Sequence, residues 1–521
     1  MQNIYWPASL LISVLVSMAM LSYARRFEPK NFALAADALL GQRVFLVCAA
    51  ILGAVVGLEA ILSVLHPEAI QYEPEGASLI AAWLFAHGQP LYHAAGNAQR
   101  YSLLYGPMMY LPFSAIFKFG GGMALVRAVG VFGVALAVAS MWVLARVSNL
   151  RGYLLLYGVG ALCLILPPIF TGRADAISFA MVVLGATAAC SGNLLALAAF
   201  AAIAVGAKAT AVLYFIPLLF LLLQERRQRA ADLWFAFAVF TGLVLLPFAV
   251  PGISLRSYVY WLSAAAKHGL VPELLVMNVV VLVTLAAPAI WAAVASAAWR
   301  QDDRRPWWGL WVAVASGVVL SVPAAKVGSG YFHIVPFAPV FMLVLVRAGG
   351  WRLGLVQRST GLVFAAFLLL SVLFMARHVS VLLFGERTIK VPDAALVEID
   401  HYIAAVGSPS TLSMGAGDLS HRQTNAALYV LRHGGAYLIN DVTMWDMEGS
   451  GIAIPEKTIE AISTCQVPNW LIPAGDKPFH SQNLYAPDRL IFGPIEAIFS
   501  QRYELVEHGH YYDLWRCRKA Q

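Results

Sequence analysis

The chain has little charge: Asp, Glu, Lys and Arg together make up 12% of its 521 residues, against about a quarter in an ordinary soluble domain. Hydrophobic residues make up 60%, and the mean hydropathy is +0.72. A composition this apolar excludes both a soluble globular protein and a disordered chain. The sequence therefore predicts a protein whose main solvent is the lipid bilayer.

Several motifs that are common in soluble enzymes and binding proteins are also absent. The five cysteines form no Cys-x-x-Cys pair and no Cys/His set with zinc spacing, which argues against a metal framework. There is no Walker loop and no Gly-x-Ser-x-Gly elbow. The net charge is +7, but no basic stripe is interleaved with aromatic residues. We therefore expect no nucleic-acid partner.

Long apolar runs fill the first part of the chain. They predict about 12 membrane helices, although several runs fall short of the roughly 20 residues that a perpendicular span needs. The first run has no basic segment before it and no small-residue cleavage site after it, so we expect a retained helix rather than a signal peptide. Residues 194–223 are interpreted as two short helices that break at Gly206–Lys208. The runs are 4–23, 44–65, 123–145, 153–170, 176–189, 194–205, 210–223, 233–250, 274–298, 310–322, 334–346 and 362–375.

Basic residues indicate how these helices are oriented. When the helices alternate in direction, every short loop rich in Lys and Arg falls on one side, which the positive-inside rule assigns to the cytoplasm. Both termini and the long loops 67–122, 171–175, 251–273 and 323–333 then fall on the other side. We therefore expect an integral protein of a bacterial inner or plasma membrane, with an extracytoplasmic active site. The basic loops contain Arg25, Arg26, Lys30 and Arg43, then Arg146 and Arg151, then segments 225–229, 300–305 and 347–358.

The composition changes at about residue 385, where charged and turn residues return and no run is long enough to span a membrane. We expect residues 1–384 to form the membrane domain and residues 385–521 a small extracytoplasmic α/β domain. One apolar helix face is predicted from Leu396, Ile399, Ile403 and Val406. Short strand-like segments follow at 411–414, 436–439, 470–472 and 511–515.

Two of the cysteines, Cys465 and Cys517, lie in this domain beside predicted strands. In an oxidising compartment they could form a disulfide, and two separately buried thiols are the alternative.

The first long outer loop holds the most informative stretch. Glu73 and Glu75 stand directly before an apolar amphipathic segment, 77–85, which we expect to lie flat on the membrane surface. A carboxylate held at that depth can act as a general base if partial burial raises its pKa. A helix cap or simple interfacial solvation is the structural alternative. Arg100 and Tyr101 follow in the same loop as candidate contacts to an acceptor.

The order of these residues resembles the GT-C superfamily, polytopic glycosyltransferases that use polyprenyl-phosphate-linked sugars. The shared elements are the acidic pair, the Gly-x-Pro-Leu-Tyr stretch that ends at Tyr92, and a Tyr-Gly-Pro stretch that begins at Tyr105. The nearest branch contains the protein mannosyltransferases and the aminoarabinose transferase of lipid A. The Asp-Glu pair of that family aligns with Pro74 and Glu75, so the resemblance implies Glu75 as the base, with Glu73 as the alternative.

Two further outer elements resemble the same superfamily. The segment 171–177 is similar to its Arg-x-Asp-Ala element, which implies a second acidic residue at Asp175 with Arg173 beside it. Lys208 resembles a basic contact to the lipid phosphate, and Lys326 falls on the same outer face. A lipid phosphate needs fixed cations that survive partial desolvation. For each cation, a side chain that snorkels to the interface is the alternative.

The remaining candidates stand in the later outer loops. Lys267 and His268 belong to the loop 251–273, which is interpreted either as a lid over the site or as a solvated loop. Tyr331 and His333 stand where the next helix re-enters the membrane, and an interface histidine is the alternative for His333. The motifs indicate no cofactor, and they leave a divalent cation open.

The sequence therefore predicts an integral membrane glycosyltransferase. By the resemblance, one sugar passes from polyprenyl phosphate to an acceptor glycan, lipid or protein, with inversion at the anomeric carbon. Glu75 would deprotonate the acceptor hydroxyl, helped by Glu73 or Asp175, while Arg173 and Lys208 hold the phosphate. A transporter or flippase of lipid-linked sugars is one alternative, and a polysaccharide polymerase or ligase with a pyrophosphate carrier is another. Charges at the outer interface, rather than at the membrane midplane, favour the enzyme.

Overall fold

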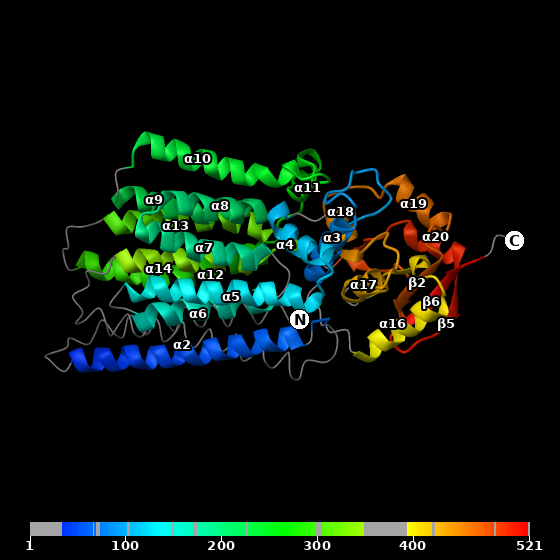
Figure 1. Ribbon diagram of the computed structural model, residues 1–521, viewed down its shortest axis with the longest axis horizontal. Helices are drawn as coiled ribbons and strands as arrows, with labels where there is room; N and C mark the ends of the chain where they lie inside the picture. The colour runs from blue at the N-terminus through cyan, green and yellow to red at the C-terminus, as the bar shows by residue number, and fades with distance from the viewer. Residues whose placement is uncertain are drawn as a thin grey trace.

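The computed structural model describes residues 34–65, 67–68, 73–101, 105–147, 151–169, 174–225, 228–298, 305–347, 393–418, 423–483 and 486–518. A bundle of helices forms one part of the molecule, and a smaller α/β domain stands at one end of it (Figure 1). The bundle contains α2 (Leu34–Leu65), α5 (Met123–Arg146), α6 (Arg151–Ile169), α7 (Ala174–Ser191), α8 (Leu194–Ala207), α9 (Val212–Glu225), α10 (Ala230–Leu245), α12 (Pro272–Ala298), α13 (Arg305–Ser321) and α14 (Ala338–Arg347).

Six helical segments of the described part are long and apolar enough to cross a membrane: Phe45–Leu65, Met123–Arg146, Ala174–Ser191, Ala230–Ala249, Pro272–Ala293 and Trp308–Ala325. Shorter apolar helices fill the rest of the bundle. The predicted runs between residues 44 and 346 each coincide with a helix, so the expected count is supported in part. The first and last predicted helices, 4–23 and 362–375, lie outside the described residues. The predicted break is confirmed, because α8 ends at Ala207 and α9 begins only at Val212.

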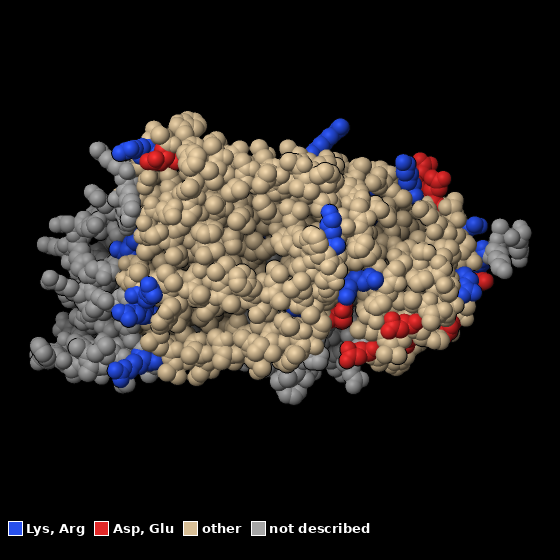
Figure 2. Space-filling view, viewed as in Figure 1, with Lys and Arg blue, Asp and Glu red and all other residues tan. Residues whose placement is uncertain are grey.

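The surface of the bundle fits a lipid environment. Large side chains such as Trp234 and Phe132 are 72% and 68% exposed, and apolar residues of this size need lipid or protein around them. Lys and Arg side chains gather at the end away from the α/β domain (Figure 2). Exposed Arg146 ends α5 at that end, and exposed Arg151 begins α6. The chain is therefore an integral membrane protein with an apolar band between two charged ends.

The α/β domain is built on a four-stranded sheet in the order β1 (Leu412–Met414), β2 (Asn469–Pro473), β6 (Tyr512–Cys517) and β5 (Tyr503–Glu507). β1 and β2 are parallel, and the other neighbours are antiparallel. Its helices are α16 (Asp393–Ala405), α17 (Gln423–Arg432), α18 (Asp441–Gly449), α19 (Glu456–Ser463) and α20 (Ile495–Arg502), and a hairpin is formed by β3 (Gln482–Asn483) and β4 (Ala486–Leu490). The predicted helix and three of the predicted strands are confirmed. The strand expected at 436–439 is wrong, because Ile439 makes only a single bridge, to Arg100.

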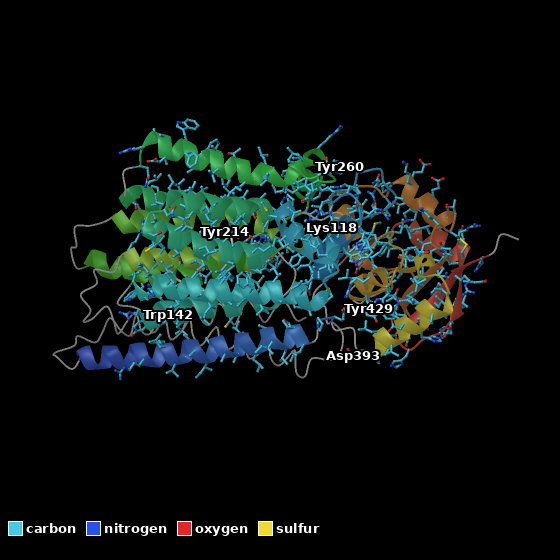
Figure 3. All side chains as sticks on the ribbon, viewed as in Figure 1. Lys118, Trp142, Tyr214, Tyr260, Asp393 and Tyr429 are labelled. Atoms are coloured by element: carbon cyan, nitrogen blue, oxygen red, sulfur yellow. A yellow bond between two sulfur atoms is a disulfide. The ribbon has the colours of Figure 1, made fainter. Side chains whose placement is uncertain are left out.

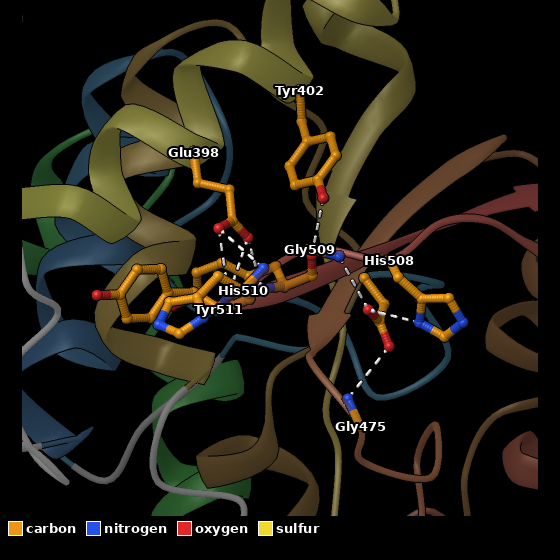
Figure 4. Close-up of polar contacts among 9 residues, drawn as sticks. Glu398, Tyr402, Gly475, His508, Gly509, His510 and Tyr511 are labelled. Carbon is orange, nitrogen blue, oxygen red and sulfur yellow. Dashed lines mark hydrogen bonds and ion pairs between the residues drawn. The ribbon is translucent and has the colours of Figure 1, made fainter.

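A disulfide and hydrogen bonds from α16 hold β6 against the rest of this domain. A disulfide joins Cys465, after α19, to Cys517 at the end of β6, with the two Cα atoms 6.0 Å apart. The turn before β6 is held by Glu398 of α16, whose carboxylate accepts from the backbone amides of His510, Tyr511 and Tyr512 at 2.8 to 3.2 Å (Figure 4). The hydroxyl of Tyr402 donates to the Tyr512 carbonyl at 2.9 Å. The carboxylate of Glu398 thus satisfies amides that would otherwise need water.

The α/β domain rests on the first outer loop. The amide of Arg100 donates to the Leu438 carbonyl at 2.8 Å, and the Thr458 hydroxyl donates to the Ala98 carbonyl at 2.7 Å. Beneath this contact, α3 (Glu73–Ala86) packs against α4 (Pro107–Lys118) and α17. Residues 75–82 are all buried. Residues 75–82 therefore meet protein rather than lipid, and the orientation of this helix relative to the membrane stays a prediction.

Candidate active site

A buried ion pair joins α3 to α5. Glu75 stands in the first turn of α3, and its carboxylate pairs with the guanidinium of Arg127. The two side chains are 0% and 2% exposed, so water does not screen their attraction. Arg127 also donates Nε to the Pro67 carbonyl at 3.3 Å. Because arginine stays charged in proteins, the pair brings a fixed positive charge to the Glu75 carboxyl.

A second buried pair joins the ends of α7 and α8. Asp175 lies in the first turn of α7, where the helix dipole favours a negative charge. Its Oδ1 atom lies 2.5 Å from the Nζ atom of Lys208, and both side chains are buried. Lys208 has an extended backbone (φ −152°) between α8 and the short helix Ala209–Ala211, so the break in the helix pair is what turns this lysine toward Asp175.

Aromatic and imidazole rings complete the surroundings of Lys208. The Nε2 atom of His333 lies 3.5 Å from Lys208 Nζ, and the ring centroid of Phe332 lies 5.7 Å from it, within cation–π range. The Tyr214 hydroxyl donates to the His333 carbonyl at 2.5 Å, which fixes the position of His333. The short helix Tyr331–His333 therefore brings a third outer segment to the Asp175–Lys208 pair.

A glycine contact holds the first outer loop against the same point. The amide of Gly106 donates to the Ala207 carbonyl at 2.9 Å. A Cβ atom on Gly106 would lie 2.1 Å from the carbonyl oxygen of Gly206, so no other residue fits here without backbone movement. Since α4 starts at this glycine and packs on α3, the contact links the element that carries Glu75 to the element that carries Lys208.

The structure gives the other predicted residues different surroundings. The side chain of Glu73, and all of Arg173, lie outside the described residues. Arg100 is buried and donates Nη1 to the Ala95 carbonyl at 2.8 Å, and the Tyr101 hydroxyl donates to the Pro90 carbonyl at 2.6 Å. Both side chains hold their own loop together.

The candidates of the later outer loops are also spread out. Lys326 donates Nζ to the carbonyls of Ala265 and Ala266 at 3.2 and 2.7 Å, at the end of α11 (Leu255–Ala265), and burial lowers the pKa of this lysine. Lys267 is exposed. His268 is buried beneath α18, and Tyr331 packs against the bundle core.

Arg127 is the site residue that the sequence analysis missed. It stands alone inside the apolar run 123–145, and a single arginine near the outer end of a membrane helix was the available signal. Among the described residues, no group of three or more His, Cys, Asp or Glu side chains is placed to hold a metal ion.

Comparison with known proteins supplies a fold relationship. No family model matches the sequence, and no curated protein matches it. The crystal structure of ArnT from Cupriavidus metallidurans bound to undecaprenyl phosphate superposes with a TM-score of 0.53 at 14% identity, over 89% of this chain and 97% of that chain. The chain therefore has the same fold as ArnT. The resemblance expected from the sequence motifs is confirmed for the fold alone.

Two further structures are similar at lower scores. ArnT in the apo state gives a TM-score of 0.49 at 14% identity, over 90% of this chain and 98% of that chain. The arabinosyltransferase EmbB from Mycobacterium smegmatis gives 0.40 at 13% identity, over 81% of this chain and 44% of that chain.

Proposed function

We propose that this protein transfers one sugar from a polyprenyl-phosphate donor to an acceptor on the extracytoplasmic side. The observation that carries the proposal is the Asp175–Lys208–His333 cluster, which gathers a buried cation at the outer helix ends. The fold supports it, since ArnT was crystallised with undecaprenyl phosphate on the same architecture. The basic end of the bundle would face the cytoplasm by the positive-inside rule, and the cluster at the other end would then face the outside.

Lys208 would bind the donor phosphate. Its ammonium group can donate to several acceptors at once, so it can hold a phosphate oxygen together with Asp175. Because the site is buried, this charge acts through a lower effective dielectric than in water. It would stabilise the negative charge that develops on the phosphate when the bond to the sugar breaks. Arg173 would stand close by in sequence as a second cation, and Lys326 would act from the neighbouring outer loop.

Glu75 would act as the general base, alone or with Glu73. The acceptor oxygen attacks C1 of the sugar, the bond between C1 and the phosphate oxygen breaks, and polyprenyl phosphate leaves with the electron pair. The hydroxyl proton passes to the carboxylate, and a single displacement inverts C1. Arg127 would fix the orientation of Glu75 without touching the substrate.

Lipid mass spectrometry on a deletion strain tests the proposal. We expect a polyprenyl-phospho-sugar to accumulate in the deletion, and we expect the wild-type gene but not Glu75→Gln or Lys208→Met to clear it. Lys118→Met changes an exposed lysine at the end of α4 and should behave as wild type. Equal clearance by all variants would refute the transferase assignment and favour a flippase. A changed glycan chain length, instead of one added sugar, would indicate a polymerase or ligase.

A further inference from the structure

Helix α18 occupies the junction between the α/β domain and the outer end of the bundle, beside α3 and the end of α11 (Figure 1). It touches two outer loops of the bundle. His268 donates from Nε2 to the backbone carbonyl of Asp446 at 2.9 Å, and since a carbonyl only accepts, the proton sits on Nε2. A Cβ atom on Gly449 would lie 3.6 Å from Cδ2 of the same imidazole, so the ring lies close to the end of the helix.

The second contact is made by Trp445 with the loop that leads to His333. Gly328 has a φ of +80°, and a Cβ atom there would lie 2.7 Å from the Trp445 indole. Glycine is therefore required both by the backbone and by the ring. This loop continues directly into Tyr331–His333, and His333 contacts Lys208. Helix α18 is thus one short segment away from the proposed donor site.

The carboxyl of Asp446 differs from the other carboxyls around the site. Glu75 and Asp175 are each neutralised by a buried cation, and Glu448 on the same helix pairs with Asn483 and Arg489. Within the described residues, no hydrogen bond or ion pair engages the Asp446 carboxyl, which is half-buried. Burial raises the pKa of Asp446 to about 6, against the opposing effect of His268. Polar groups held at this depth are common at binding sites.

Trp445 and Asp446 are consecutive residues of α18, so an indole and a carboxylate leave the helix about 100° apart and can meet different parts of one carbohydrate. A sugar ring offers an apolar C–H face that packs on an aromatic ring, and its hydroxyls donate to a carboxylate. Trp445 and Asp446 are both half-buried, so part of each side chain is open to a ligand. We propose that Trp445 and Asp446, braced by His268, form the subsite that binds a carbohydrate acceptor. The proposal rests on the proposed transferase function and names its acceptor class.

Saturation-transfer NMR tests the subsite without requiring turnover. The full chain in nanodiscs is titrated with the methyl glycosides of glucose, galactose, mannose and rhamnose. We expect at least one glycoside to bind the wild type, and Asp446→Asn to weaken its binding about tenfold through loss of charge-assisted hydrogen bonds. Trp445→Leu should act in the same direction, and Trp445→Phe, which keeps an aromatic ring, should retain most of the binding. Glu456→Gln, an exposed carboxyl of α19, is the matched control and should change nothing.

Each outcome bears on the proposal. Equal binding by the wild type and Asp446→Asn, or no binding of any glycoside, would overturn it. The melting temperature of each variant shows whether a loss of binding follows from a loss of folding. If Trp445→Leu fails to fold, Trp445→Phe still tests whether an aromatic ring is needed for binding. Undiminished clearance of donor lipid together with unchanged glycoside binding in Asp446→Asn would refute the subsite alone. Glycoside binding by a protein that clears no donor lipid would refute the transferase function alone.

Discussion

The guanidinium of Arg127 on α5 pairs with the carboxylate of Glu75 on α3, where neither side chain reaches water. The pair joins the first outer helix to the wall of the bundle. It therefore holds the proposed base at one place. Ion pairs that are cut off from water are strongly sensitive to the loss of one member, because the remaining charge stays buried without compensation.

Replacing Arg127 by Met should abolish transfer and lower the melting temperature. The Glu75 carboxylate would then be buried without its counter-charge, which destabilises by about 3–5 kcal/mol. The double variant Glu75→Gln/Arg127→Met should melt higher than Arg127→Met alone, since it removes both charges. Differential scanning fluorimetry in detergent measures this. Arg146→Gln, at the exposed far end of α5, is the control. Strictly additive shifts would mean that the two charges do not interact.

Replacing Lys208 by Met should weaken the binding of undecaprenyl phosphate about 10- to 100-fold, the value of a charge-assisted hydrogen bond. Lys208→Arg should recover only part of the affinity, because the planar guanidinium does not reproduce the compact ammonium between Asp175 and His333. Titration by microscale thermophoresis gives the affinities. Undecaprenol, which has no phosphate, provides the ligand control, and its binding should not respond to either change. Unaltered phosphate binding by Lys208→Met would contradict the proposed donor contact.

The outer loops should be sensitive to acid through His93. This imidazole is fully buried between the rings of Tyr101 and Trp261, with centroids 5.0 and 4.7 Å away. Burial, and after it the charge of Arg100, lowers the pKa of His93 to about 3. An unfolded histidine takes up its proton near pH 6.5. The unfolded state therefore binds more protons between pH 6.5 and 3, and stability is present above pH 6.5 and lost as the pH falls toward 3.

The expected slope is up to about 1.4 kcal/mol per pH unit in that window. Melting temperatures between pH 7 and 4.5 measure it, and His93→Gln should flatten the dependence because glutamine does not titrate. His433→Gln, at an exposed position on the α/β domain, should leave the slope as it is. An identical pH dependence for His93→Gln and the wild type would rule out His93 as the source.

Removing the disulfide should destabilise the α/β domain. Cys465 and Cys517 are 52 residues apart, and a loop of that length corresponds to about 4 kcal/mol in the chain-entropy model. Cys465→Ser/Cys517→Ser should melt earlier in the α/β domain, and hydrogen exchange should rise in β6. Cys163 is buried in α6 of the bundle, so Cys163→Ala should not affect exchange in β6. If a reducing agent left the melting temperature of the wild type unchanged, the disulfide would not stabilise the α/β domain as expected.

The helices of the bundle could be predicted because the apolar composition of each one is enough to indicate a membrane helix. A long apolar run specifies a membrane helix without reference to any partner, and the polar interruption at Lys208 specifies the break between α8 and α9. Three site residues could be proposed because charges at the ends of membrane helices are rare and can be recognised from the sequence around each one: Glu75, Asp175 and Lys208.

The pairing of these residues could not be predicted. Arg127 meets Glu75 only because the first turn of α3 approaches α5, and nothing near either residue in the sequence encodes that approach. The segment around Ile439 has a strand-like pattern, but its partner is Arg100, so a local pattern pointed to the wrong element. The burial of α3 could not be predicted for the same reason, since α17, which packs against it, belongs to a distant part of the chain.

The contact between the first outer loop and the α/β domain has a consequence for biosynthesis. The Tyr437 hydroxyl donates to the carbonyl of Arg100, which precedes it by 337 residues. A ribosome that adds roughly 5–20 residues per second needs on the order of 20–70 s to travel between them. By the predicted topology α3 would cross the membrane during that interval, before α17, which packs against it, has been made. A chain that stops before α17 would therefore lack the surface that packs on α3, so the last part of the chain to be made completes the surroundings of its first long loop.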